Sequence, residues 1–262
     1  IVTNAHVISG GKSCWIALDT GYTYDAELVG FDKDRDLAVL KAVDAADLPA
    51  AEFGDSDRCR VGDTVYAIGN PLGIELRGTL TDGIISAINR DVMMEGRVMT
   101  LLQTNAALNN GNSGGPLINE YGQVIGINTL KMSGNGGEDE ATVEGLGFAL
   151  PSSDLCYVVN DIIANGRFRG VPAMGILVIN DTAADGSPQV SVYSVTEGGG
   201  GAEAGLQAGD VLLAADGQTV HDINDLMAVR RTHIADETIT LTVLRDGRTF
   251  EAAVTLYAET EQ

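Results

Sequence analysis

The chain has 262 residues, a net charge of −21 at pH 7 and an isoelectric point of about 4.2. Its 44% hydrophobic and 20% charged residues are typical of a globular chain with a packed core, which excludes a disordered segment. The acidic balance, without any basic cluster, excludes a protein that binds nucleic acid through its phosphates.

Short β-prone runs, bounded by Gly, Pro, Asn or Asp, recur through the first 150 residues. No convincing helical stretch lies between them, so the pattern predicts an antiparallel sandwich or barrel. The runs occupy residues 13–19, 25–32, 36–43, 64–69, 83–90, 100–106, 116–130 and 144–151.

A helix is predicted over residues 153–166, where the composition changes. Ser152 or Ser153 is its expected N-cap, and Gly166 follows its end. We expect this helix to connect two domains. The apolar side chains at helical spacing are Leu155, Val158, Val159, Ile162 and Ile163.

A second unit follows the helix and extends to residue 262. Strands together with short helices suit a small interaction module. The predicted elements are strands over 170–180 and 189–195, a helix over 222–233 with Asp222 or Asn224 as its N-cap, and a hairpin across Asp246–Gly247.

Three other features predict no binding site. The glycine run 198–201 is expected to be a flexible loop, because no P-loop lysine follows it. The acidic stretch 133–145 lacks the regular ligand spacing of a calcium loop and is expected to be a mobile surface loop. The cysteines are odd in number and have no metal-site spacing, so buried free thiols are expected at Cys14, Cys59 and Cys156.

The stretch NNGNSGGPLIN, residues 109–119, contains the pattern G-x-S-x-G around Ser113. Glycines and asparagines are also ordinary turn residues, so the motif alone leaves open a nucleophile or a simple turn. An α/β-hydrolase needs a helix directly after its serine and a histidine later in the chain. Here Pro116 and a strand-like run follow the serine, and His221 and His233 lie in the second unit, where surface positions are expected.

His6 and Asp36 are the candidates for a base and for the acid that orients it. His6 lies near a strand end and Asp36 opens an apolar strand, and either residue alone is more often structural than catalytic. With Ser113 they follow the chain order His, Asp, Ser of chymotrypsin-type proteases. A serine hydroxyl becomes an effective nucleophile when a neighbouring imidazole accepts its proton.

The chain resembles the HtrA (Deg) family of serine proteases, in blocks that occur in the family's order. These blocks are TNAHVI, DRDLAVLK, AIGNPLGIELRGTLTDGIISA, NNGNSGGPLIN, VIGIN, GLGFALPSS, AMGILV and AEAGLQAGDVLLAADGQTVHDINDL, and they cover essentially the whole chain. The resemblance implies a mostly β fold, in which a chymotrypsin-like double β-barrel is followed by a PDZ domain of small α+β type. The implied boundaries are a trypsin-like serine protease domain at 1–152, a linker helix at 153–166 and the PDZ domain at 167–262.

The resemblance also implies a role for each residue of the His, Asp, Ser set. His6 would be the general base and then the general acid, Asp36 would orient it, and Ser113 would attack the peptide carbonyl. Backbone N–H groups of the segment Gly111, Asn112 and Ser113 would form the oxyanion hole.

Two binding sites are implied in the same way, and no metal or cofactor. A substrate pocket for small or medium aliphatic side chains would be lined by Ala107, Leu108, Asn128 and Thr129, with the acidic loop as a further wall. A PDZ site would hold the C-terminal carboxylate of a partner peptide through backbone N–H groups around Met174, Gly175 and Ile176, and the peptide's last apolar side chain in a pocket near the helix that carries Leu226. The alternative for the second site is that MGILV is simply a core strand.

The expected function is a serine endopeptidase that degrades unfolded or damaged proteins outside the cytoplasm, in the periplasm or at the cell envelope. Its expected partners are unfolded proteins and C-terminal peptides, and a homotrimer or larger assembly is implied for the full-length protein. The alternative is a proteolytically inactive PDZ-containing chaperone or binding protein. The intact set of His6, Asp36 and Ser113 disfavours that alternative.

The sequence departs from the family pattern at two places. Only five residues precede His6, so the first barrel is expected to lack its opening strand, and a targeting segment is expected in a missing upstream part. Asn105 stands where the family usually has Asp, a difference that the sequence alone leaves unexplained.

Overall fold

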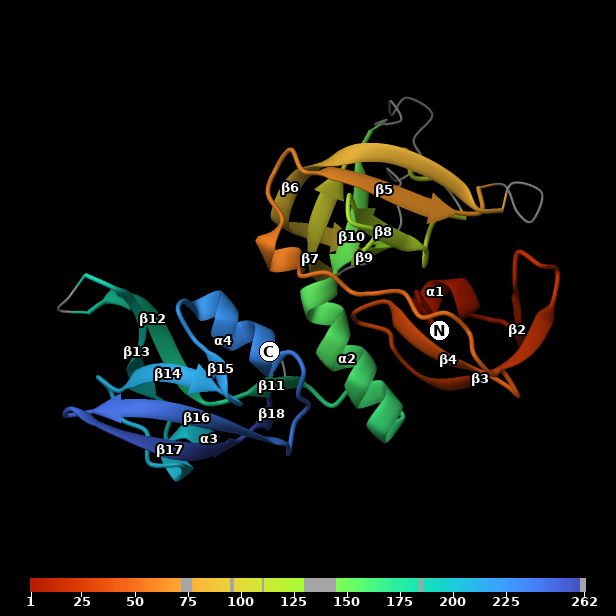
Figure 1. The fold of residues 1–262 in the computed structure, drawn as a ribbon. Helices are drawn as coiled ribbons and strands as arrows, with labels where there is room; N and C mark the ends of the chain where they lie inside the picture. Colours follow the sequence, from red (N-terminus) through yellow and green to blue (C-terminus); the bar gives the residue numbers. More distant parts are fainter. Residues whose placement is uncertain (72–76, 95–96, 110, 130–144, 184–185, 260–262) are drawn as a thin grey trace. The chain divides into compact units, whose positions relative to one another are not determined.

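The chain forms two compact units, seen in a computed structural model that describes residues 1–71, 77–94, 97–109, 111–129, 145–183 and 186–259. The first unit comprises residues 1–155 with 165–167, and the second comprises residues 156–164 with 168–262. Strands dominate both units (Figure 1), which confirms the predicted mostly β fold class.

The first unit begins with an antiparallel sheet of four strands in the order β1-β4-β3-β2. The apolar run Leu37–Leu40 makes β4 the buried strand of this sheet, because all four of its side chains are covered. Within the described residues the sheet is open, with β1 and β2 at its edges. The bounds are β1 Val2–Thr3, α1 Ala5–Ile8, β2 Cys14–Ala17, β3 Thr23–Asp32 and β4 Leu37–Ala42.

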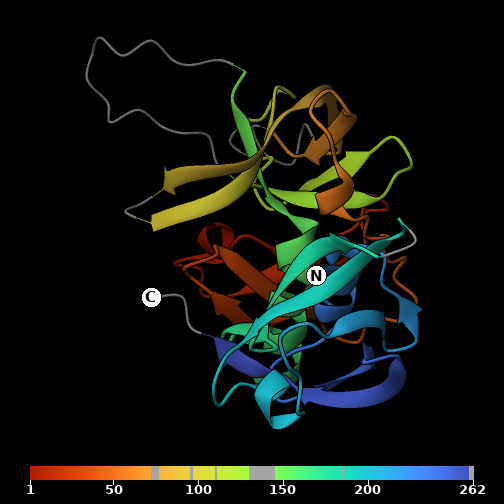
Figure 2. The same ribbon diagram turned by 90° about the vertical axis from the view of Figure 1, so that its left-hand side faces the viewer.

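A closed barrel of six strands, in the order β10-β7-β6-β5-β8-β9, forms the rest of the first unit. Its long strands β6 and β7 lie side by side as an antiparallel hairpin, drawn in yellow in Figure 2. The core inside it includes Val65, Ile85, Leu102, Leu117 and Ile125. The bounds are η1 Ser56–Arg58, β5 Thr64–Gly69, β6 Thr79–Met94, β7 Arg97–Thr104, β8 Pro116–Asn119, β9 Val124–Thr129 and β10 Gly147–Pro151.

The predicted connecting helix is α2, Ser152–Asn165, and the glycine that follows it, Gly166, has the left-handed φ of +74° typical of a helix end. The predicted N-cap was wrong. The Ser152 hydroxyl donates to Gly54 O at 2.7 Å and accepts from Ser56 N at 3.1 Å. The N–H of Ser153 donates instead to Ser56 Oγ at 3.0 Å, so a residue 97 positions away supplies this cap.

The second unit has a main antiparallel sheet in the order β12-β13-β14-β16-β17, with β15 paired to β14 and a separate pair β11-β18. The predicted hairpin across Asp246–Gly247 is confirmed, and both turn residues have positive φ, as a two-residue type I′ turn requires. The bounds are β11 Val171–Ala173, β12 Ile176–Thr182, β13 Pro188–Val195, α3 Gly200–Glu203, β14 Val211–Ala215, β15 Gln218–Thr219, α4 Ile223–Arg230, β16 Thr238–Arg245, β17 Arg248–Thr255 and β18 Tyr257–Glu259.

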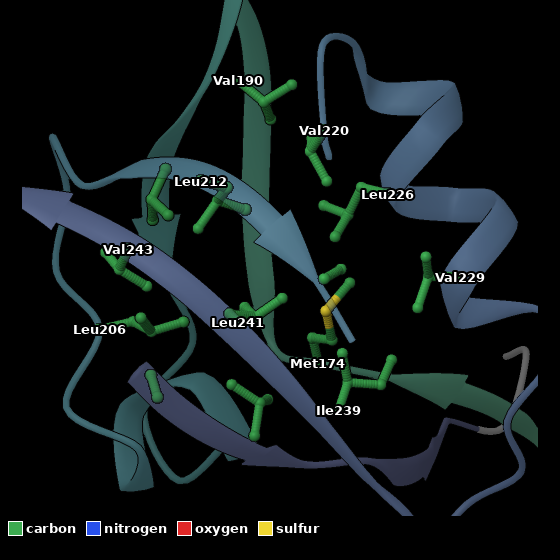
Figure 3. Packing of buried hydrophobic residues seen from close by; sticks show 14 of the residues in the cluster. Met174, Val190, Leu206, Leu212, Val220, Leu226, Val229, Ile239, Leu241 and Val243 are labelled. Atoms are coloured by element: carbon green, nitrogen blue, oxygen red, sulfur yellow. The ribbon is translucent and has the colours of Figure 1, made fainter. Parts of the chain in front are cut away.

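Helix α4 packs against this sheet through its apolar face. Asp222 is its N-cap, as predicted, because Asp222 Oδ1 accepts from Asp225 N at 3.0 Å. Figure 3 shows Leu226 and Val229 on the side of α4 that faces the core, and both are fully buried. Leu226 and Val229, three residues apart, thus mark the face of α4 that packs on the core.

The glycine run 198–201, predicted to be a flexible loop, is largely buried. Gly199, Gly200 and Gly201 are buried, and α3 begins at Gly200. A Cβ on Gly200 would overlap Thr255 O, and a Cβ on Gly199 would lie 3.0 Å from Gly175 Cα. Glycine is required here because backbone segments approach closely.

Other predictions have mixed outcomes. The three cysteines are free, as expected, but they are half-buried rather than fully buried. The acidic stretch 133–145 lies almost entirely outside the described residues. No helix in the described ranges is long and apolar enough to cross a membrane.

A buried ion pair of the second unit joins Arg245 to Asp210. The two side chains make a bidentate contact with both N···O distances at 2.6 Å, and the Asp210 side chain is only 1% exposed. Gln207 N also donates to Asp210 Oδ2 at 2.8 Å, and the Arg245 guanidinium lies 5.0 Å from the centroid of the Phe250 ring. The hydrogen bonds from Arg245, and secondarily that from Gln207, lower the pKa of Asp210 against the opposing effect of burial.

We expect Arg245→Met to lower the free energy of unfolding of the second unit, because it leaves a buried carboxylate without its cation. Because the folded pKa of Asp210 is depressed, its stabilisation is present above the unfolded pKa, about 3.9, and disappears as the pH falls through the folded value. The difference between wild type and Arg245→Met should therefore be large at pH 7 and shrink in acid. Urea unfolding at pH 7 and pH 3 measures both.

Arg248→Met is the matched control, since Arg248 is exposed on the same hairpin. It should change the free energy of unfolding by about 0.5 kcal/mol at most. Equal effects of the two substitutions would show that the Arg245–Asp210 pair adds no more to the free energy of unfolding than an exposed arginine does.

Candidate active site

His6 and Asp36 are brought together by the pairing of β1 with β4. Thr3 lies opposite Ala38, so the residues just after β1 meet the residues just before β4. His6 Nδ1 lies 2.7 Å from Asp36 Oδ2, and His6 N donates to Asp36 Oδ1 at 2.9 Å. The two side chains are 32% and 18% exposed, so the imidazole is held on one side and open on the other.

The carboxylate of Asp36 is surrounded by donors. Besides the two groups of His6, Thr129 Oγ1 donates to Asp36 Oδ2 at 3.2 Å. A carboxylate that accepts from several fixed donors is held in one orientation. Because His6 Nδ1 faces the carboxylate, the proton of a neutral imidazole is drawn to Nδ1 and Nε2 is left as an acceptor.

Ser113 lies in the turn before β8 and is half-buried. The residue after it, Gly114, donates its N–H to Asn128 O at 2.8 Å. Asn128 and Thr129 are consecutive in β9, and Thr129 contacts Asp36. Adjacent residues of β9 therefore contact the turn that carries Ser113 and the carboxylate of Asp36.

The serine turn also lies against the residues that precede the histidine. A Cβ on Gly114 would overlap Thr3 Oγ1 and would lie 3.2 Å from Asn4 N. Gly114 has φ +80°, which glycine adopts without strain. The structure thus gathers the three residues of the predicted triad, which are up to 107 positions apart in the chain, around the β1–α1 junction.

The predicted oxyanion segment has a defined backbone course. Gly111 has φ +102°, and its carbonyl accepts from Asn70 N at 2.9 Å. Asn112 N donates to Asn109 O at 3.0 Å, so this N–H is already engaged. If this segment forms the predicted oxyanion hole, its donors among the described residues are the N–H groups of Gly111 and Ser113, and Asn112 contributes by holding the turn.

We expect Gly111→Ala to lower kcat/KM about 10²- to 10³-fold, the usual cost of losing one oxyanion donor. A Cβ at this position would overlap the backbone oxygen of Asn70, and a φ of +102° is strained for alanine. Hydrolysis of a peptide substrate measures the loss. Gly122→Ala is the control, because Gly122 has φ +79° in the β8–β9 turn with nothing within 4 Å of its Cβ position. Comparable activity in both variants would show that the N–H of Gly111 is not a donor of the oxyanion hole.

Comparison with known proteins gives the same domain pattern. Residues 1–127 match the trypsin-like peptidase domain family, and residues 172–256 match the PDZ domain family. The solved structure of the HtrA-type protease AlgW with a decapeptide aligns over 100% of this chain and 80% of its own, with 36% identity and a TM-score of 0.59. The chain belongs to the HtrA family of serine proteases.

Curated HtrA relatives align along nearly the whole chain but are longer. The serine protease Do-like HtrA of Lactobacillus helveticus is 39% identical over 98% of this chain and 64% of that protein. A probable periplasmic serine endoprotease, DegP-like, of Brucella suis is 41% identical over 98% of this chain and 50% of that protein. The chain therefore spans between half and two thirds of the length of these two HtrA proteins.

The position at which this chain departs from the HtrA pattern has a clear structural role. Asn105 Oδ1 accepts from Ile84 N at 2.8 Å, across the bulged region of the β6–β7 hairpin. An aspartate offers the same acceptor oxygen, which explains why the fold accommodates the asparagine.

The residues predicted to line the substrate pocket lie in different environments. Ala107 is exposed, whereas Leu108 is buried in the barrel core and packs over Gly147, where a Cβ would lie 2.7 Å from Leu108 Cδ1. Asn128 and Thr129 are fully buried. Asn128 Nδ2 donates a hydrogen bond to Pro116 O, and Thr129 Oγ1 donates one to the Asp36 carboxylate. Their side chains are thus engaged elsewhere, and the pocket assignment stays a prediction for the exposed Ala107 and for backbone atoms.

The loop around Gly175, which is predicted to bind the carboxylate of a partner peptide, has its carbonyl groups turned inward. Gly201 N donates to Met174 O at 2.7 Å, and Thr196 N donates to Gly175 O at 2.8 Å. In a trans peptide the next N–H points opposite to the carbonyl. The N–H groups of Gly175 and Ile176 therefore point away from the segments that hold these carbonyls.

Among the strands that the structure describes, none pairs with the outer edge of β12 beside this loop. β12 is the terminal strand of its sheet. Ile176 lies opposite Val195, and the hydrogen bond between the strands joins their neighbours, from Thr196 N to Gly175 O. The N–H of Ile176 thus faces the unpaired edge, where a peptide strand can add. Leu226 is fully buried in the core of the second unit. Two other apolar side chains of α4, Ile223 and Met227, pack against this core but are only partly buried.

Two features of the site were not singled out from the sequence. Thr129 was assigned to a pocket wall, but its hydroxyl contacts Asp36. Asn4 was passed over, although its side chain donates to Asp36 O at 3.0 Å. The available signal was its place directly before the Ala-His of the TNAHVI block.

Proposed function

We propose that this chain is the protease and PDZ part of a serine endopeptidase that cleaves unfolded or damaged proteins outside the cytoplasm. The observation that carries the proposal is the arrangement around β9: Thr129 holds Asp36, and the adjacent Asn128 holds the residue after Ser113. Membership of the HtrA family supports it, as does the name periplasmic endoprotease given to the Brucella suis relative.

In this proposal each residue has a chemical task. His6 Nε2 accepts the proton of Ser113 as Oγ attacks the substrate carbonyl, and the Asp36 carboxylate, 2.7 Å from His6 Nδ1, stabilises the imidazolium that forms. The N–H groups of Gly111 and Ser113 donate to the oxyanion. The proton then passes from His6 to the leaving amine, and water repeats the sequence on the acyl-enzyme.

The second unit would bind C-terminal peptides. The outward N–H groups of Gly175 and Ile176 would donate to a carboxylate, and the open edge of β12 would pair with the peptide backbone. We retain the boundaries 1–152, 153–166 and 167–262 and a homotrimeric or larger assembly as proposals that rest on the family resemblance.

The test is cleavage of a permanently unfolded protein, reduced and carboxymethylated α-lactalbumin, by the full-length gene product. Fragments should appear without ATP, and an aliphatic residue should precede each cut. A fluorophosphonate should block cleavage and label one residue, Ser113, identified by peptide mass spectrometry. No fragments and no label, with a C-terminal peptide present to engage the PDZ domain, would favour the inactive chaperone or binding protein.

A further inference from the structure

Asn4 occupies a position at which asparagine normally has a different task. It is the residue directly before α1, with the extended φ and ψ of an N-cap, −76° and 147°. An N-cap asparagine normally accepts a hydrogen bond from the first turn of its own helix. Here the side chain makes no such bond.

The amide of Asn4 is turned toward the aspartate instead. Asn4 Nδ2 donates to the backbone carbonyl of Asp36 at 3.0 Å, and Asn4 is fully buried. Asn4 Oδ1 is buried without a hydrogen-bond partner among the described residues. A buried amide that leaves its acceptor unsatisfied costs free energy, so the one bond that it makes is structurally important.

Asp36 takes over the capping of α1. Its carbonyl accepts from Ala5 N at 3.1 Å as well as from Asn4, and its carboxylate accepts from His6 N. Asp36 has φ +53°, a left-handed conformation that is uncommon for residues other than glycine. Two donors on one carbonyl fix the peptide plane that follows this residue, and with it the direction of the side chain.

We propose that Asn4 is a positioning residue, which holds the backbone of Asp36 so that its carboxylate faces His6 Nδ1. The proposal rests on the proposed function, since Asp36 and His6 are the acid and the base of that mechanism. The hydrogen bond that the Asn4 side chain makes is to Asp36 O. Asn4 acts through Asp36: it holds the backbone of that residue, while His6 N and Thr129 Oγ1 hold its carboxylate.

Two substitutions separate positioning from helix capping. Asn4→Ala removes the donor and leaves no capping group. Asn4→Ser also removes the donor to Asp36 O, because the serine side chain is too short to reach it, but serine is among the best N-cap residues and can accept from Val7 N. A capping role predicts that serine restores activity, and a positioning role predicts that it does not.

We expect kcat to fall on the order of tenfold to a hundredfold in both variants, with KM within about threefold of wild type, because a misplaced catalytic group affects the chemical step. Asn119→Ala is the control. Asn119 makes three side-chain hydrogen bonds in the β8–β9 turn, away from Asp36, and its loss should affect stability without changing kcat. Urea unfolding of each variant gives the folded fraction by which kcat is normalised.

A second readout does not depend on cleavage. The full chain labelled with ¹⁵N-histidine has three imidazoles, and the proton on His6 Nδ1, in a 2.7 Å contact with a carboxylate, should give a downfield NMR signal. A His6→Gln variant assigns it. The signal should weaken or move upfield in Asn4→Ala and Asn4→Ser and persist in Asn119→Ala.

The outcomes are distinct. Restoration of kcat by Asn4→Ser, or an unchanged signal in both Asn4 variants, would overturn the positioning role. A wild type that does not cleave, but whose signal is lost in Asn4→Ser, would sink the proposed function and leave the positioning role standing. Loss of both kcat and the signal in both variants would support the two proposals together.

Discussion

Ser113→Ala is expected to abolish cleavage of unfolded proteins, with kcat lower by on the order of a million-fold. The substitution removes only one oxygen atom, in a turn that is held by backbone hydrogen bonds of Gly114 and Gly115 rather than by the serine hydroxyl. The fold should therefore remain intact. Gel analysis of substrate fragments over several hours, at equal protein concentrations, measures the residual rate.

The same variant distinguishes an enzyme from a binding protein. Its PDZ domain should bind a C-terminal peptide as tightly as the wild type does, because the carboxylate loop around Gly175 belongs to the other unit. Ser13→Ala is the matched control, an exposed serine in the first unit that should leave cleavage unchanged. Cleavage by Ser113→Ala within tenfold of wild type would assign the activity to another residue or to a contaminant.

Local patterns predicted the elements of the fold well. Most strands follow from short apolar runs between turn residues, although the runs 116–130 and 170–180 each form two strands. Helix α2 follows from its apolar spacing and from Gly166 at its end. The hairpin at Asp246–Gly247 was predictable for the same reason, since a tight turn needs residues that tolerate positive φ. Each of these signals is contained within about ten neighbouring residues.

The contacts that cap helices across the chain were not predictable in this way. Two serines at the start of α2 looked like caps, but the acceptor for Ser153 N is Ser56, 97 positions earlier. The amide of Asn4, directly before α1, likewise binds Asp36, 32 positions later. Nothing in a local sequence window shows that a distant segment supplies a better partner.

The side chains of β9 illustrate a second limit. Every residue of Val124–Thr129 is buried, so the strand has no alternation of polar and apolar faces to show which way each side chain points. The sequence placed Thr129 near the active site without distinguishing a pocket wall from a contact to Asp36. Only the paired strands around it determine that its hydroxyl faces the carboxylate.

Asp36→Asn is expected to lower kcat about ten-thousandfold without unfolding the protein, and the reason lies in the donors around the carboxylate. Oδ1 faces the backbone N–H of His6 at 2.9 Å, and Oδ2 faces His6 Nδ1 at 2.7 Å. An asparagine must keep its oxygen toward the backbone N–H, because an NH₂ group there would meet another donor. Its NH₂ group then faces His6 Nδ1.

That orientation reverses the tautomer of the imidazole. Nδ1 becomes the acceptor of the asparagine amide, so the proton of neutral His6 moves to Nε2. Nε2 can then no longer accept the proton of Ser113. The substrate still binds, so KM should stay within about threefold while kcat falls, as measured by steady-state hydrolysis of a peptide substrate.

Asp34→Asn provides the matched control, because it removes the same charge from an exposed carboxylate two residues earlier. Its kcat should equal that of wild type, which separates the tautomer effect from a general loss of negative charge near the site. If Asp36→Asn retained a tenth or more of the wild-type kcat, His6 would not depend on this carboxylate for its orientation. The contacts of Thr129 and Asn4 with Asp36 would then serve the fold alone.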